Sequence, residues 1–305
     1  MFATLEDRVV RYAALQPCYN AFVDSRTPGS ERKENFTIIG PGVAENPAQH
    51  VHIAVPHGFN IGGARQPPAC VNSQHSHDTA EVFVVHSGHW RFDLGETASD
   101  ATVECGPGDV ISLPTRTFRG FTNIGDDSGF LWAVLGGDNP GRVTWAPQVF
   151  DLAHDHGLVL LDDGRLIDTA AGETVPAGAA RMPRTTVAQV AALQRFNDTQ
   201  AAELVSRDHA GDGEVPVIGC GGPLAVPAGF SLHRLDLAAG DHTGHRPAAP
   251  EVLFVHRGSA AATTGGERVE LAEGDTITLP VDAGYRLEAT APLVAFIVRG
   301  SSATA

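Results

Sequence analysis

The sequence is poor in positive charge and contains a single lysine, Lys33. Its 305 residues include 21 Lys and Arg against 36 Asp and Glu, which gives a formal net charge of −15. Nucleic-acid-binding domains carry clustered basic residues, and anionic membrane surfaces attract basic segments. No such cluster is present, so we expect no nucleic-acid partner and no membrane partner. We assign the acidity to solubility.

Cysteine is also scarce. The four cysteines lie far apart, without a CxxC pair, which argues against a structural zinc ribbon: Cys18, Cys70, Cys105 and Cys220. So few cysteines in a chain of this length favour a reducing, cytoplasmic location. The first residues do not resemble a signal peptide, and no run of about 18 apolar residues predicts a membrane span.

Short β-prone runs punctuated by Gly, Pro, Asn and Asp dominate the chain, which is typical of an all-β sandwich or barrel. The expected strands of the first half are 36–39, 50–55, 81–86, 89–94, 110–113, 118–122 and 130–135. Before them, apolar spacing and a Thr4–Asp7 capping box predict an amphipathic helix over about 4–22. Between the halves we expect a partly helical connector with a hairpin over 158–167 and a helix over 185–196.

The second half repeats the first. The run EVFVVHSG at 81–88 matches EVLFVHRG at 251–258, an offset of 170 residues. The run GDVISLP at 108–114 matches GDTITLP at 274–280, an offset of 166 residues. Two matches in the same order, differing by one shortened loop, indicate a duplicated β-domain.

These runs also carry a family resemblance. His75, His77, Glu81 and Gly88 match the first motif of the cupin superfamily, and the second motif is matched by Gly108, Pro114 and Asn123. The chain therefore resembles a bicupin, which implies two jelly-roll barrels. The expected divisions are 1–35 (N-terminal helix and loop), 36–150 (metal-binding barrel), 151–214 (connector) and 215–300 (degenerate second barrel).

The resemblance implies one divalent metal per chain, bound by His75, His77 and Glu81. Residues two apart on a strand share a face, so both imidazoles can point into the barrel. Two histidines and a carboxylate are the facial triad of non-haem Fe(II) oxygenases. Fe(II) is therefore our preferred ion, with Mn, Ni or Zn as alternatives. Arg119 stands where cupins supply a fourth ligand.

The second barrel lacks a complete ligand set. His245 and Glu251 stand at two of the equivalent positions, but Pro247 and Tyr285 occupy the other two. Proline has no ligating side chain. We therefore expect this barrel to stabilise the protein, without a tight metal site.

Arg119 has two interpretations. It could orient an anionic substrate through a bidentate contact, as a catalytic and substrate-binding residue. Alternatively, it could pair with Glu81 and replace the metal. Other candidate substrate contacts are Phe83, Phe121, Asn60 and Gln66, the first two because aromatic side chains suit an aromatic substrate.

Three functions remain open. The first is a metal-dependent dioxygenase acting on a small anionic substrate, similar in architecture to gentisate-type bicupins, which use three histidines where this chain offers two and a glutamate. The second is a non-redox lyase, isomerase or decarboxylase, since a fold does not determine a function. The third is a non-catalytic bicupin that binds a small molecule. Because sheet edges need covering, we also expect a homodimer.

Overall fold

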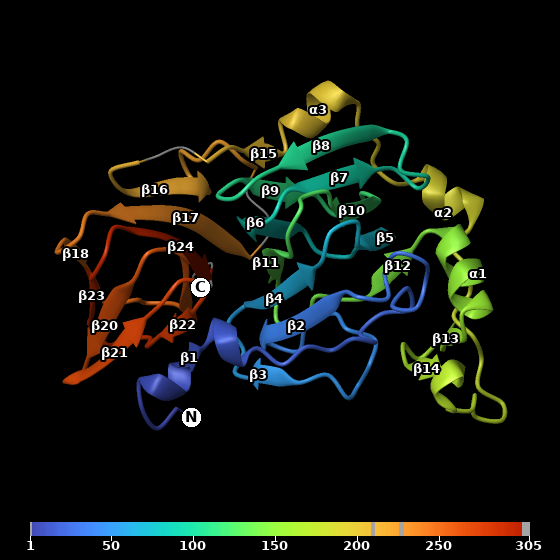
Figure 1. Ribbon diagram of the computed structural model, residues 1–305, viewed down its shortest axis with the longest axis horizontal. Coiled ribbons are helices and arrows are strands. Elements are labelled where there is room, and N and C mark those ends of the chain that lie inside the picture. Colours follow the sequence, from blue (N-terminus) through green and yellow to red (C-terminus); the bar gives the residue numbers. More distant parts are fainter. Residues whose placement is uncertain (1, 209–210, 226–228, 301–305) are drawn as a thin grey trace.

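The computed structural model describes residues 2–208, 211–225 and 229–300 and arranges them in two β-barrels side by side (Figure 1). The first barrel is built from a seven-stranded and a five-stranded sheet, and the second from a six-stranded and a four-stranded sheet. The predicted all-β fold with two barrels is therefore confirmed.

The sheets of the first barrel come from residues 34–145, with one short strand added from the connector. The seven-stranded sheet has the order β15 (Val205–Ser206), β9 (Val110–Leu113), β6 (Glu81–Ser87), β11 (Gly129–Gly136), β4 (Phe59–Gln66), β2 (Glu34–Ile39) and β3 (Val51–Ile53). The five-stranded sheet has the order β12 (Val143–Trp145), β5 (Val71–His77), β10 (Arg119–Asn123), β7 (Trp90–Leu94) and β8 (Ala101–Cys105).

The second barrel is built from residues 213–300, with one short strand from the N-terminus. The six-stranded sheet has the order β1 (Val9–Val10), β22 (Thr276–Leu279), β19 (Glu251–Arg257), β24 (Leu293–Gly300), β17 (Phe230–Leu237) and β16 (Gly213–Ile218). The four-stranded sheet has the order β18 (His242–Thr243), β23 (Tyr285–Ala289), β20 (Ala260–Thr264) and β21 (Glu267–Leu271).

The connector contains the predicted hairpin, formed by β13 (Leu158–Leu160) and β14 (Leu166–Asp168). The helix expected over 185–196 is shorter, because only α2 (Val187–Ala191) is helical after a capping box at Thr186. The sequence did not predict α1 (Pro147–Asp155), α3 (Asp198–Ala202) or the 3₁₀ turn η3 (Thr169–Ala171). None of the described helices is long and apolar enough to cross a membrane.

The N-terminal helix predicted over 4–22 is wrong. The capping contacts do form, since the Asp7 amide donates to Thr4 Oγ1 at 3.2 Å and the Thr4 amide to Asp7 Oδ2 at 2.9 Å. In place of a helix there are two short 3₁₀ turns, η1 (Glu6–Arg8) and η2 (Tyr12–Ala14), with strand β1 between them. The β-branched valines of β1 pair with an open sheet edge of the second barrel, and that pairing overrides the helical pattern.

The two barrels exchange these short strands reciprocally. The N-terminal strand β1, which precedes the first barrel, pairs with β22 of the second barrel, and β15, which precedes the second barrel, pairs with β9 of the first. An arginine follows each strand. Arg11 donates to Asp275 Oδ2 at 2.8 Å, and Arg207 donates to Asp109 Oδ2 at 2.8 Å. Each arginine also donates to a backbone carbonyl of the neighbouring β21 or β8. We call these two contacts the arginine clasps.

The seven-stranded and six-stranded sheets pack face to face between the barrels. Alternate residues of β6 point into the first barrel, and the residues between them, Val82 and Val84, pack in one core with Phe254 and Phe296 of the second. Trp132 stacks on Phe254 with ring centroids 4.8 Å apart. This apolar contact explains why β6 is buried over almost its whole length instead of alternating with polar residues.

His86 and His256 occupy equivalent positions in the repeat and meet at this interface, with ring centroids 5.5 Å apart. His86 Nδ1 and both ring nitrogens of His256 have no hydrogen-bond partner among the described residues. Burial lowers the pKa of both imidazoles, that of His256 to about 3. Both histidines are therefore neutral in the folded protein at pH 7.

This histidine pair predicts acid destabilisation. The folded-state pKa of His256 lies below its unfolded-state value, so the unfolded state binds a proton more tightly than the folded state. The contribution of His256 to the free energy of unfolding is therefore fully present above about pH 6.5 and is lost as the pH falls toward 3. The free energy of unfolding should decrease by about 1.4 kcal/mol per pH unit below 6.5 from His256 alone. Urea denaturation between pH 7.5 and 5 measures the slope. A His86→Leu/His256→Leu variant should flatten it, whereas His154→Gln, at an exposed histidine, should not; equal slopes for both would contradict the assignment.

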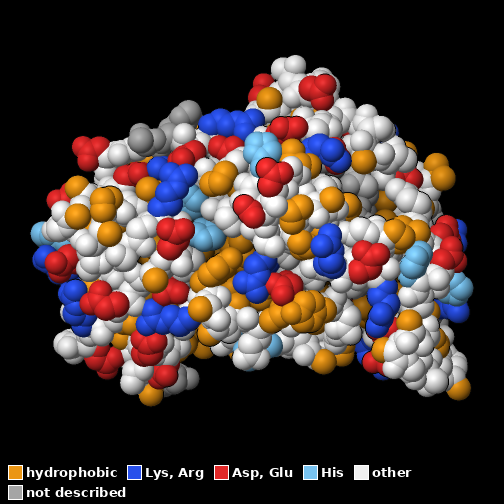
Figure 2. Space-filling model, in the orientation of Figure 1, with side chains coloured by type: hydrophobic (Ala, Val, Ile, Leu, Met, Phe, Trp, Pro, Cys, Tyr) orange, Lys and Arg blue, Asp and Glu red, His pale blue; other side chains and the backbone are white. Residues whose placement is uncertain are grey.

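Charged side chains of both signs are interspersed over the face shown in Figure 2.

Candidate metal site

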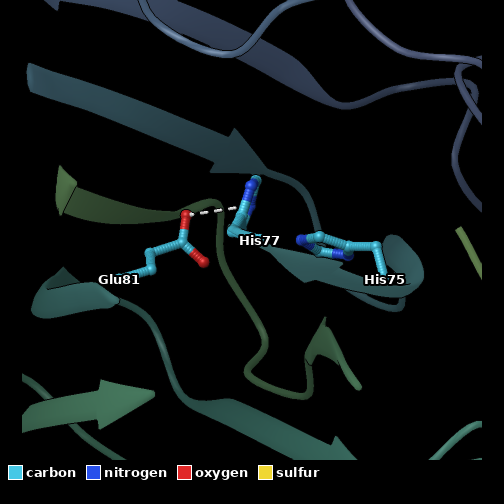
Figure 3. Close-up of side chains that lie close together, drawn as sticks. All are labelled: His75, His77 and Glu81. Atoms are coloured by element: carbon cyan, nitrogen blue, oxygen red, sulfur yellow. Dashed lines mark ion pairs between the residues drawn. The ribbon is translucent and has the colours of Figure 1, made fainter. Parts of the chain in front are cut away.

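His75, His77 and Glu81 converge inside the first barrel (Figure 3). The two histidines lie on β5, and Glu81 is the first residue of β6. One ligand atom from each lies within 4.8 Å of the others, and all three side chains are buried. Among the described residues, this is the one group of His, Cys, Asp and Glu with such spacing.

Both histidines are neutral and have a ring nitrogen that is available to a metal ion. His75 Nδ1 lies 2.7 Å from the carbonyl oxygen of Ser73 and donates to it, so Nε2 carries the free lone pair. His77 Nδ1 has no partner among the described residues. Burial, reinforced by the nearby Arg119 charge, holds the pKa of both histidines well below its ordinary value. Neutral imidazoles are the ligating form.

The donor set fits a divalent ion. Ligand atoms around one ion, with bonds of about 2.0–2.2 Å, are about 3 to 4 Å apart, so only a small contraction would be needed. Two imidazoles and one carboxylate suit Fe, Mn, Ni and Zn.

Arg119 lies on β10, directly opposite His75. Its Nη2 donates to Glu81 Oε2 at 2.5 Å, and its Nη1 donates to the carbonyl oxygens of His75 and Thr117 at 3.4 Å. Glu81 Oε1 faces His77 Nε2 at 3.6 Å. Burial raises the pKa of the Glu81 carboxyl, and the adjacent guanidinium offsets part of that rise. One carboxylate oxygen is thus held by Arg119, and the other is directed at the histidines.

A cavity of about 70 Å³ adjoins these ligands. Three of the residues predicted to contact substrate line it, namely Asn60, Phe83 and Phe121. The other two do not: Arg119 is turned to Glu81, and Gln66 is fully buried, with no partner for its side-chain amide among the described residues.

The sequence did not identify the rest of the cavity wall. Trp145 on β12 lies opposite His75, with ring centroids 5.3 Å apart, and Glu45 Oε1 accepts from its indole nitrogen at 2.7 Å. Phe22 and Val43, from loops before and after β2, also line the cavity. These residues lie outside the motif, and no spacing in the sequence relates them to His75.

The equivalent site in the second barrel is closed by its own side chains. Glu251 accepts from Tyr285 through Oε1 at 2.8 Å and from Arg299 through Oε2 at 2.5 Å. His245 Nε2 lies 3.2 Å from the same Oε2. Both carboxylate oxygens of Glu251 therefore accept a hydrogen bond, whereas Arg119 donates to only one oxygen of Glu81.

Comparison with known families agrees with this geometry. Residues 64–135, which include the three candidate ligands and Arg119, match the family described as "Cupin domain". The match lies within the first barrel. A search of curated protein sequences finds no match.

Solved structures share this fold over most of the chain. A salicylate 1,2-dioxygenase from Pseudaminobacter salicylatoxidans is 15% identical, with a TM-score of 0.57, over 95% of this chain and 82% of that one. An oxalate decarboxylase variant from Bacillus subtilis is 11% identical, with a TM-score of 0.57, over 98% of this chain and 78% of that one. At these identities the likeness concerns the fold alone. The protein is a bicupin in fold.

The Glu81–Arg119 pair predicts the cost of removing its cation. In an Arg119→Leu variant, Glu81 would be a buried carboxylate without a counter-charge. The metal-free protein should lose about 3–5 kcal/mol of unfolding free energy, measured by urea denaturation with a chelator present. As a control, Arg165→Leu breaks an exposed pair with Asp163 and should cost about 1 kcal/mol or less. If both variants lost the same unfolding free energy, the buried pair would contribute no more to stability than the exposed one, and the prediction would fail.

Proposed function

We propose that the protein is a metal-dependent enzyme acting on a small molecule in the first barrel, and that it is an Fe(II) dioxygenase for a small anionic substrate. The observation that carries the proposal is the group of His75, His77 and Glu81 beside a cavity, with Arg119 paired to the one carboxylate. The bicupin fold of the salicylate dioxygenase and the oxalate decarboxylase supports an enzyme.

The charge of the site supports an anionic substrate. Two neutral imidazoles contribute no charge, and the Arg119 guanidinium cancels the Glu81 carboxylate. The full charge of a bound divalent ion would then remain uncompensated inside the barrel, where the dielectric is low. A substrate carboxylate or phenolate oxygen offsets it. Arg119 would thus favour an anion through Glu81 without touching it. The direct substrate contact expected from the sequence stays a prediction, and it requires the guanidinium to leave Glu81.

The protein side chains have separate parts in this proposal. His75, His77 and Glu81 would hold the ion, which would supply a Lewis acid and, as iron, a redox centre for O₂. Phe83, Phe121 and the other apolar walls would exclude water and position the substrate.

A second candidate is a non-redox decarboxylase or lyase, favoured by the size of the cavity. Its volume of about 70 Å³ is about half of the roughly 150 Å³ of a cavity that holds benzene. That space suits a compact acid, whereas an aromatic acid requires the loops with Phe22 and Val43 to move outward.

Metal content tests the proposal first. Protein from iron-, manganese- and zinc-supplemented media should contain about one metal ion per chain, lost in His75→Ala, by elemental analysis. Replacing His245 of the second barrel with alanine should leave the metal content unchanged. Two ions per chain would show that the second barrel also binds metal, and no ion in any medium would remove the enzyme proposal. Light scattering on the same samples tests the expected homodimer.

Oxygen uptake separates the two reactions. With iron-loaded protein, a dioxygenase should consume one O₂ per substrate turned over when aromatic acids such as salicylate and gentisate are supplied. A decarboxylase or lyase should convert small dicarboxylic acids without net O₂ uptake, and CO₂ release would identify decarboxylation. The His77→Ala variant serves as the control for both assays, and turnover that persists in it would place the chemistry elsewhere.

A further inference from the structure

The edge of β5 just before the metal-ligating histidines is completed by a loop. On one side, β10 runs along the strand, with Thr122, Phe121 and Arg119 opposite Val71, Asn72 and His75. On the other side, β12 pairs only with residues 75–77. Residues 24–33, which we call the clamp segment, contact the remaining part, at residues 71–73.

The clamp segment satisfies the exposed backbone groups of this edge. The Val71 amide donates to the Gly29 carbonyl at 2.8 Å, and Ser30 Oγ donates to the Val71 carbonyl at 2.7 Å. The Ser73 amide donates to Asp24 Oδ2 at 3.0 Å. The remaining group, the Ser73 carbonyl, accepts from the ring of His75 itself.

A fully buried ion pair fixes the clamp segment. Lys33 and Asp24 are both 0% exposed, and Lys33 Nζ donates to Asp24 Oδ1. The same ammonium donates to Asn72 Oδ1 at 3.1 Å. The pair therefore forms hydrogen bonds with two successive residues of β5: Lys33 binds Asn72, and Asp24 binds Ser73.

The clamp segment is connected to the metal ligand His75 through a single residue, Ser73. The Ser73 carbonyl accepts from His75 Nδ1 and so fixes the tautomer of the ring. Asn72 Nδ2 lies 3.4 Å from the same ring nitrogen, and Asp24 accepts from the Ser73 amide. Hydrogen bonds behind a metal ligand of this kind typically change metal affinity by about 10–100-fold. A fully buried ion pair is in itself a poor source of stability, so its presence here calls for another role.

We propose that Lys33 and Asp24 are positioning residues of the metal site, which makes the N-terminal clamp segment part of the metal centre. This inference rests on the proposed metal site at His75, His77 and Glu81. The segment lies outside residues 64–135, the part of the chain that matches the cupin domain.

The test measures Co(II) binding to the full-length chain. The Asp24→Ala/Lys33→Met variant removes both charges together with the carboxylate that accepts from the Ser73 amide, so no unpaired charge remains buried. Its Co(II) affinity, by calorimetric titration, should fall about 10–100-fold, and the visible d–d bands of the bound ion should shift. Arg32→Met is the matched control, because it removes an exposed cation one residue away, and it should retain the wild-type affinity and spectrum.

A folded double variant with wild-type affinity and spectrum would overturn the proposal while leaving the metal site intact. Failure of the wild-type chain to bind Co(II) would instead overturn the metal site, and the positioning role with it.

If the double variant does not fold, hydrogen exchange in the wild-type protein decides. Saturating Co(II) should slow exchange of residues 71–75 more than that of residues 293–300 in the second barrel, by up to about 100-fold at 100 times Kd. Equal slowing in both segments would count against the clamp.

Discussion

A carboxylate buried inside a β-barrel needs a partner, and this constraint shapes both halves of the protein. An unpaired buried charge costs several kcal/mol. The first barrel meets the requirement with Arg119 alone, on one oxygen of Glu81. The second meets it with Tyr285 and Arg299, one on each oxygen of Glu251. Besides the missing ligands, the closed polar cluster therefore differs from the candidate metal site in the number of donors around the equivalent glutamate of the repeat.

Much of the architecture could be predicted because the β-signal is local and repeated. The two offsets of the internal repeat defined equivalent strands, and the period of two placed His75 and His77 on one face. The N-terminal helix was wrong for the opposite reason. The sequence around Val9 has a helical pattern and a genuine capping contact, but its partner, β22, lies more than 260 residues away. A window of local sequence contains no trace of that strand.

The surroundings of the site could not be predicted because they depend on which loops cover the barrel. Trp145 and Lys33 lie far from the motif in sequence, and only the pairing of β12 and the course of the clamp segment bring them to His75. Arg116 is a related case. It adopts a left-handed φ of +61°, as does the equivalent Asp282 at +58°. Both residues adopt a conformation that glycine reaches more easily, and the sequence gives no sign of it.

The reciprocal strands β1 and β15 make the two barrels interdependent in their folding. Each barrel completes a sheet with chain that belongs, by order, to the other, and each arginine clasp crosses the same boundary. Separating the barrels would expose two sheet edges and the apolar face around Trp132 and Phe254 at once. The two barrels should therefore resist separation, although each can still open locally. The second barrel, although it lacks a complete ligand set, therefore has a structural role, because the first barrel is not a self-sufficient folding unit.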